Sequence, residues 1–140
     1  MNDRYLYRAK RKNWRELPKE MWWVEGYLYG IWERRYILWG MTNDVPDMVE
    51  VDPSTICQCT GLKDKNGKLI WENDIVAYWD TYSTESGYSE ADCIGKVFWD
   101  GETMSFQVTG RLSAESYEVL DECSVIGNIF DNPEPLEVGE

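Results

Sequence analysis

Carboxylates and cysteines are the side chains considered first for chemistry in this 140-residue sequence, which contains no histidine. Histidine is the commonest general base near neutral pH and a frequent metal ligand, so both roles would fall to other residues. The four cysteines include no Cys-x-x-Cys pair, and a structural zinc site would need an unusual all-cysteine geometry. We therefore expect Cys57, Cys59, Cys93 and Cys123 to be reduced, partly buried thiols, and we expect no metal ion and no cofactor.

The carboxylates between residues 64 and 74 lie in segments typical of tight turns. The letters D-K-N-G at 64–67 begin like a calcium-binding loop, but the glycine comes two positions too early and the downstream glutamate is missing. Glu72 and Asp74 flank Asn73 and could exchange protons, although carboxylates in turns more often accept backbone hydrogen bonds. No glycine-rich phosphate-binding motif is present. We predict no catalytic residues and a protein that is not an enzyme.

A basic, aromatic arm at the N-terminus could form a different kind of site. Single-strand binders combine rings that stack on bases with cations that contact phosphates, and residues 4–12 alternate these two types. The net charge of −12 opposes the approach of phosphates, so nucleic-acid binding is the alternative function and not the first choice. The contacts of this alternative would come from Arg4, Tyr5, Tyr7, Arg8, Arg11 and Lys12.

The charge is unevenly distributed along the chain. Residues 1–20 hold seven basic and three acidic groups, whereas residues 81–140 hold two basic and thirteen acidic groups. Such an acidic half attracts basic partners, although it could also serve solubility alone. Charge would set the encounter rate, and tyrosines beside the acids would supply short-range affinity. The candidate partner-binding residues are Tyr82, Glu85, Tyr88, Glu90 and Asp92.

Apolar residues recur mostly with period two, which is typical of β-strands. Sustained helical periodicity is scarce, so we expect one or two short helices. The segment 80–92 contains almost no aliphatic side chain and is predicted to be a solvated, mobile loop. Strands are expected over 4–9, 24–40 (as a hairpin), 47–53, 75–79 and 93–108 (as a hairpin).

Tight turns must join these strands. Asn66 and Gly67 suit a hairpin that needs positive φ, and Asp100 with Gly101 indicates another. Asn73 should also adopt positive φ, because asparagine is the non-glycine residue that enters the left-handed region most readily. The predicted structural turn residues are Asp64, Asn66, Gly67, Asn73, Asp74, Asp100 and Gly101.

The length and the strand pattern predict a single domain of the mainly-β class. We expect either a small, strongly bent sheet or an SH3-like, partly open barrel that sharp turns help to form. An N-terminal β-hairpin region would occupy residues 1–58, a barrel-like subregion residues 59–132, and an acidic tail residues 133–140.

Two long segments have a distinctive sequence, namely Q-C-T-G-L-K-D-K-N-G-K-L-I-W-E-N-D-I-V at 58–76 and S-V-I-G-N-I-F-D-N-P-E at 124–134. Both resemble the YopX family of phage and prophage proteins, which Y-R-A-K-R-K-N-W at 7–14 matches weakly. The chain departs from the family pattern at Cys57, Cys59 and Asn73, where the family usually has Gly, Tyr and Gly. The resemblance implies a phage or prophage origin, and it supplies no catalytic residues.

These observations favour a non-enzymatic protein-interaction module or modulator in the cytoplasm of the bacterial host. Its partner would be a host or phage protein, and the charge favours a basic one; self-association into a homo-oligomer is a further expectation. The N-terminus lacks the pattern of a signal peptide. No apolar run approaches the ~20 residues that a membrane helix requires, so no membrane partner is expected.

Overall fold

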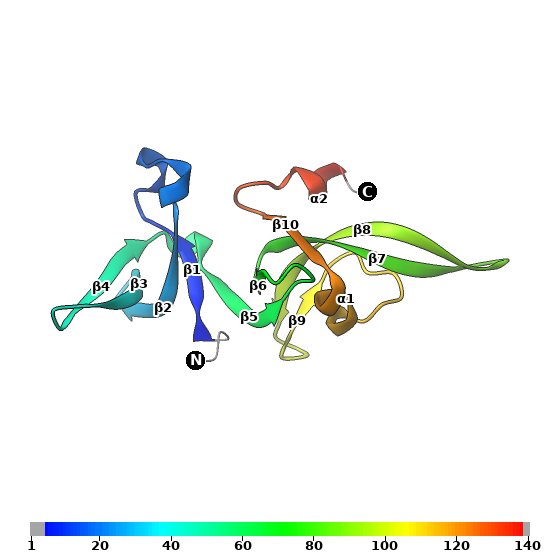
Figure 1. Ribbon diagram of the computed structural model, residues 1–140, viewed down its shortest axis with the longest axis horizontal. Helices are drawn as coiled ribbons and strands as arrows, with labels where there is room; N and C mark the ends of the chain where they lie inside the picture. The colour runs from blue at the N-terminus through cyan, green and yellow to red at the C-terminus, as the bar shows by residue number, and fades with distance from the viewer. Residues whose placement is uncertain (1–4, 139–140) are drawn as a thin grey trace. The chain divides into compact units, whose positions relative to one another are not determined.

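The computed structural model describes residues 5–138, which form two antiparallel sheets and a few short helices (Figure 1). The mainly-β class predicted from the sequence is therefore confirmed, and the described strands do not close into a barrel. The chain divides into two compact units, the N-terminal unit (residues 1–59) and the C-terminal unit (residues 60–140). No helix among the described residues is long and apolar enough to cross a membrane.

The N-terminal unit is built on antiparallel strand pairs. Alternation places one residue in two on the core side, where Ala9, Val24, Ile37 and Val51 are almost fully buried. Short 3-10 helices join the strands at two places. The elements are β1 (Tyr7–Lys10), η2 (Trp14–Glu16), η3 (Lys19–Met21), β2 (Trp23–Ile31), β3 (Arg34–Thr42), β4 (Val45–Val51), η4 (Pro53–Thr55) and the start of β5 (Cys57–Lys63).

The C-terminal unit contains a four-stranded sheet in the order β10-β7-β8-β9. Its core forms where α1 packs Val119 and Leu120 against inward residues of β7 and β8, among them Val76 and Val97. The elements are the end of β5, then β6 (Leu69–Trp71), β7 (Asp74–Thr84), β8 (Gly87–Asp100), β9 (Ser105–Val108), α1 (Ser116–Glu122), β10 (Ser124–Asn128) and α2 (Glu134–Val138), which lies in the predicted acidic tail.

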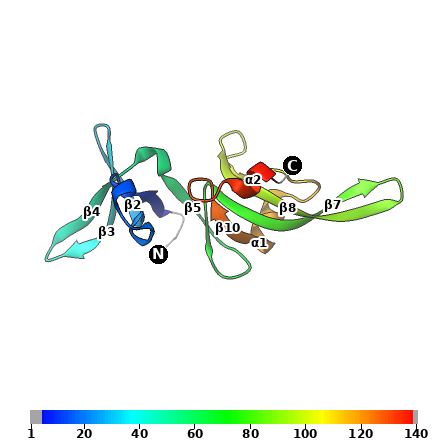
Figure 2. The same ribbon diagram turned by 90° about the horizontal axis from the view of Figure 1, so that it is seen from above.

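The prediction of a mobile loop over residues 80–92 is wrong. The segment lies in β7 and β8, and the last pair, Thr84 with Gly87, leaves only a two-residue turn. Backbone hydrogen bonds join the two strands, and the threonine and tyrosine side chains of this segment favour extended backbone. The pair of strands therefore forms without burying aliphatic side chains. Figures 1 and 2 show the two strands continuing as a ribbon beyond the other elements of this unit.

The turn between β5 and β6 needs positive φ at one residue, whereas the sequence predicted it at two. Gly67 has a φ of 82°, whereas Asn66 does not have positive φ. The N–H of Asp64 donates to the carbonyl of Lys68 at 2.8 Å, so three residues form the loop, and such loops need one left-handed residue at the end. The predicted positive φ at both Asn66 and Gly67 therefore holds only for the glycine.

Asp64 holds this corner of the fold together. Its buried carboxylate accepts backbone hydrogen bonds from Asn66 and Lys68 within the turn, each at 2.9 Å, and from Val125 on β10, also at 2.9 Å. Burial alone would raise the pKa of Asp64, but these N–H donors outweigh it and hold the pKa below its usual value. The turn at residues 64–68 is thus structural, and it also fixes the position of β10.

Asn73 has a φ of 71°, the positive value that the sequence predicts. Its backbone N–H donates to Val97 at 2.8 Å, and its carbonyl accepts from Ile129 at 3.1 Å, so the residue cannot relax without breaking both bonds.

We predict that Asn73→Val lowers the free energy of unfolding by about 1–2 kcal/mol, because a β-branched side chain is strained in the left-handed region. Asn73→Gly should be neutral or slightly stabilising. Thermal unfolding measures both changes. Asn66→Val, at a turn position without positive φ, is the matched control, and an equal loss at both positions would contradict the strain argument.

Candidate functional site

An open groove lies in the C-terminal unit, lined by β5, β7, β8 and α1. Its volume of about 1800 Å³ exceeds the roughly 300–1000 Å³ of pockets that enclose small ligands. Four large apolar side chains on its wall remain exposed to solvent. They are Leu62, Trp79, Ile94 and Tyr117, and Trp79 and Tyr117 are the most exposed at 63% and 72%.

The polar residues of the groove are mostly acidic. Two of its carboxylates come from β8 and three from α1, and all five are exposed. Two exposed lysines, Lys63 and Lys65, lie at the end of β5 and in the turn that follows it. The acidic set is Glu90, Asp92, Glu118, Asp121 and Glu122. The groove therefore combines exposed rings with a surplus of negative charge.

The register of β7 and β8 determines which side chains share the face of Trp79. Trp79 lies directly opposite Asp92, and Thr81 lies opposite Glu90 in the next pair of that face. Residues opposite each other in an antiparallel pair project to the same side of the sheet. Trp79, Asp92 and Glu90 therefore lie next to one another on one face of the β7–β8 pair, in the groove.

The same register divides the predicted partner-binding residues. Glu90 and Asp92 line the groove. Tyr88 shares their face but lies further along the ribbon, Tyr82 projects to the opposite face, and Glu85 lies in the turn. All five side chains are exposed, and only two of them belong to one site.

Trp79 and Tyr117 are groove residues that the sequence analysis did not single out. A signal for Trp79 was present, because the alternation that places Val76 and Tyr78 on the core side places Trp79 on the outer side. Tyr117 carried no comparable signal, since a seven-residue helix is too short to show a clear periodicity.

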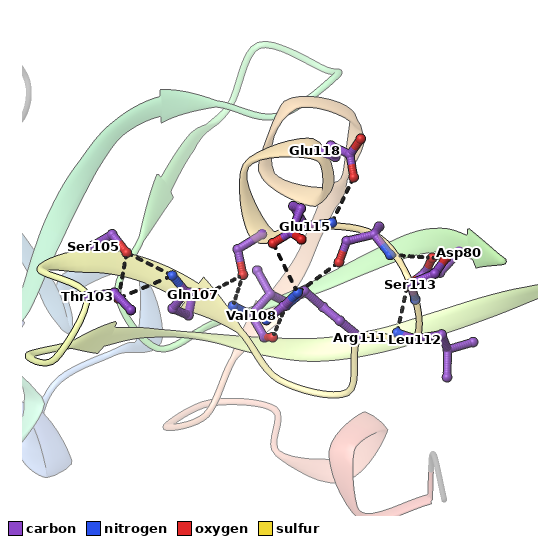
Figure 3. Close-up of polar contacts among 12 residues, drawn as sticks. Asp80, Thr103, Ser105, Gln107, Val108, Arg111, Leu112, Ser113, Glu115 and Glu118 are labelled. Atoms are coloured by element: carbon purple, nitrogen blue, oxygen red, sulfur yellow. Dashed lines mark hydrogen bonds and ion pairs between the residues drawn. The ribbon is translucent and has the colours of Figure 1, made fainter. Parts of the chain in front are cut away.

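Asp80, which lines the groove, forms hydrogen bonds with the loop around Leu112 and Ser113 (Figure 3). Its buried carboxylate accepts backbone hydrogen bonds from Thr81 at 2.7 Å, Leu112 at 2.7 Å, Ser113 at 3.1 Å and Ala114 at 2.9 Å. Burial would raise the pKa of Asp80, but this ring of N–H donors outweighs it and lowers the pKa. Asp80 thus holds the loop that leads into α1.

The start of α1 is fixed by a second group of contacts, which Figure 3 also shows. Ser116 donates to the side chain of Gln107 at 2.7 Å and accepts from the N–H of Val108 at 3.1 Å, which ties the helix to β9. Glu115 and Glu118 form a capping box, in which the carboxylate of Glu118 accepts a hydrogen bond from the N–H of Glu115 at 2.7 Å. With Val119 and Leu120 in the core, the helix presents its outer face to the groove.

The basic arm is engaged with tryptophan rings of its own unit. Lys10 is 1% exposed, and its Nζ lies 3.9 Å from the ring centroid of Trp14, 4.4 Å from Trp22 and 5.5 Å from Trp23. A cation over an aromatic face is attracted by the negative face of the ring, and the attraction grows as water is removed. Lys10 is therefore the centre of an aromatic cage.

The other residues of the nucleic-acid alternative are placed as follows. Arg8 lies over the ring of Trp23 at 5.0 Å, and Tyr7 packs beside the core of the N-terminal unit. Tyr5 is 67% exposed. Nucleic-acid binding by this arm stays a prediction.

Two of the remaining cations of that alternative contact residues of the N-terminal unit. Arg11 donates to the carbonyl of Met21. Lys12 forms an ion pair with Glu50 at 2.9 Å. Arg4 lies outside the described residues.

The cysteines are separated by burial. Cys57, Cys59 and Cys123 are buried, and Cys93 is half-buried. Burial and the nearby Asp64 carboxylate raise the pKa of Cys123 to about 11, and burial with Asp80 and Asp92 raises the pKa of Cys93. Within the described part of the chain, no group of three or more Cys, Asp or Glu side chains could hold a metal ion.

We predict that Asp80→Asn lowers the free energy of unfolding by about 2 kcal/mol, because charge-assisted hydrogen bonds to the loop are lost. The pKa of Asp80 is lowered on folding, so its contribution is complete above the unfolded carboxylate pKa of about 3.9 and is lost as the pH falls through the folded pKa. In the variant, the free energy of unfolding should fall less steeply as the pH is lowered, which denaturant unfolding from pH 2 to 7 would measure. Asp121→Asn, which removes an exposed carboxylate, should leave this pH dependence unchanged.

For the aromatic cage, we predict that Lys10→Met and Trp14→Leu are coupled by about 1–2 kcal/mol in a double-mutant cycle of unfolding free energies. The reason is that each change removes the same contact. Lys12→Met with Trp14→Leu is the control cycle and should be additive, because Lys12 pairs with Glu50. Additivity in both cycles would contradict the cage.

Comparison with known proteins supplies a family. A model described as YopX protein matches residues 7–137. The crystal structure of protein EF1440 from Enterococcus faecalis is similar over 93% of this chain and 96% of that chain, with 24% sequence identity and a TM-score of 0.49. A search of curated proteins gives no match. Because the family match covers nearly the whole chain, as its two motifs indicate, the chain belongs to the YopX family.

Proposed function

We propose that this chain is a non-enzymatic protein-interaction module whose C-terminal unit binds a basic segment of a partner protein. The observation that carries the proposal is the open groove, in which exposed rings are flanked by carboxylates. Aromatic anchors beside charged groups are the usual energetic centre of a protein interface. The partner would be a host or phage protein met in the cytoplasm of the bacterial host.

The form of the groove supports a polypeptide ligand over a small substrate. It is wide and open, and its rings lie on the surface, where they do not enclose a reacting group. Asp80 is the buried carboxylate among the described lining residues, and its oxygens already accept hydrogen bonds from the loop. A carboxylate held ionised in this way is poorly suited to transfer protons, which favours binding over catalysis.

The charge distribution supports a basic ligand. Residues 60–140 contain seventeen acidic and five basic groups, a net charge of −12, whereas residues 1–59 contain nine of each. The whole net charge of the chain therefore belongs to the unit that contains the groove. Such a field accelerates the approach of cationic segments, and added salt weakens it.

To test the proposal, a peptide of alternating Lys and Leu can be titrated against the full chain, with its Glu-for-Lys counterpart as a negative probe. We predict binding of the basic peptide alone, with a dissociation constant that rises with salt. Glu90→Lys combined with Asp121→Lys should weaken binding at least about tenfold, because both carboxylates line the groove. Isothermal titration calorimetry measures each affinity.

The matched control is Glu20→Lys combined with Glu33→Lys. These exposed carboxylates lie in the N-terminal unit, and the change in net charge is the same. An equal loss in both double variants would mean non-specific attraction and contradict the groove as the site. Failure of the basic peptide to bind at all would contradict the proposed function.

A further inference from the structure

Strand pairing places the exposed ring of Trp79 beside two carboxylates of the neighbouring strand β8. Asp92 lies directly opposite Trp79, and Glu90 lies in the next pair along the same face. Opposite residues on one face have Cβ atoms about 5 Å apart, and diagonal neighbours about 7–8 Å apart. A group that rests on the indole of Trp79 is therefore within reach of both carboxylates.

Three tryptophan rings of the N-terminal unit, Trp14, Trp22 and Trp23, lie under cations, whereas Trp32 and Trp39 of the same unit are exposed. Arg15 lies over Trp14 at 4.4 Å and Arg8 over Trp23 at 5.0 Å, in addition to the lysine of the aromatic cage. Trp14, Trp22 and Trp23 are thus covered by cations of the same unit.

Trp79 differs from these three rings. Among the described residues of the C-terminal unit, no basic side chain lies over its indole, which is 63% exposed. The neighbouring acids, Asp92 and Glu90, would attract a cation to the same ring. The two halves of a cation site, a ring face and carboxylates, are present without a cation from this unit.

From this arrangement we infer that Trp79, Asp92 and Glu90 form a docking subsite for an arginine side chain of the partner segment. The inference rests on the proposed function, because it names the anchor that the basic segment would carry. A planar guanidinium can stack on the indole while its edge donates two hydrogen bonds to one carboxylate. An ammonium group cannot satisfy both contacts in the same way, so lysine should bind less tightly.

Tyr117 completes the surroundings of the subsite from another element. Its ring projects from α1 and is 72% exposed, and it lines the same groove as Trp79. Because Asp80 and the capping box fix the approach to α1, the helix offers this ring on a rigid support. The apolar stem of a bound side chain would pack between the two walls.

The test compares two peptides that differ only in having Arg or Lys at each basic position of the alternating sequence with Leu. We expect the wild-type chain to bind the arginine peptide about fivefold to tenfold more tightly by isothermal titration calorimetry. Trp79→Leu should weaken binding of the arginine peptide more than binding of the lysine peptide, so that the variant binds both peptides with equal affinity. Asp92→Asn should also reduce the preference, because one bidentate acceptor is lost.

Trp32→Leu is the matched control, because Trp32 is 93% exposed and lies in the N-terminal unit. It should leave both affinities unchanged. Equal affinity of the wild-type chain for the two peptides, or a preference that survives Trp79→Leu, would overturn the arginine subsite while the proposed function stands. If neither peptide binds, both the subsite and the proposed function are wrong.

Discussion

The antiparallel register between β7 and β8 is the constraint on which the C-terminal unit depends. It places Val76, Tyr78 and Asp80 on the core side and Trp79 beside Asp92 on the other side. Because side chains alternate with a period of two, shifting one strand by one residue would turn the charged side chains toward the core and expose the core residues. The hydrophobic core and the groove are therefore two results of one pairing, and neither can change without the other.

The buried carboxylates show why a count of charges along the sequence does not describe a binding surface. Asp64 and Asp80 both belong to the acidic unit, yet each is buried and its oxygens accept backbone hydrogen bonds that fix a turn or a loop. Their charge stabilises local structure by replacing water with N–H donors. The charge available to a partner comes instead from exposed side chains such as Glu90 and Asp121.

The sequence predicts the features that depend on local chemistry. Period-two alternation identified the mainly-β class, and asparagine chemistry identified the positive φ of Asn73. The ribbon over residues 80–92 was missed because backbone pairing, which leaves no aliphatic pattern, holds it. The cage around Lys10 was missed because Trp14 lies in η2 and Trp22 directly follows η3, and only folding brings the two rings together.

The two units differ in their charge balance and in whether cations lie over their tryptophan rings near the carboxylates. In the N-terminal unit the charges balance, and cations such as Lys10 and Arg8 lie over tryptophans of the same unit, which satisfies both groups internally. In the C-terminal unit the acids outnumber the bases, and Trp79 remains exposed beside Asp92. A long-range field needs unbalanced charge, and short-range affinity needs rings not already covered. Both conditions are met in the C-terminal unit, so a basic partner would be steered to the same unit that can hold it.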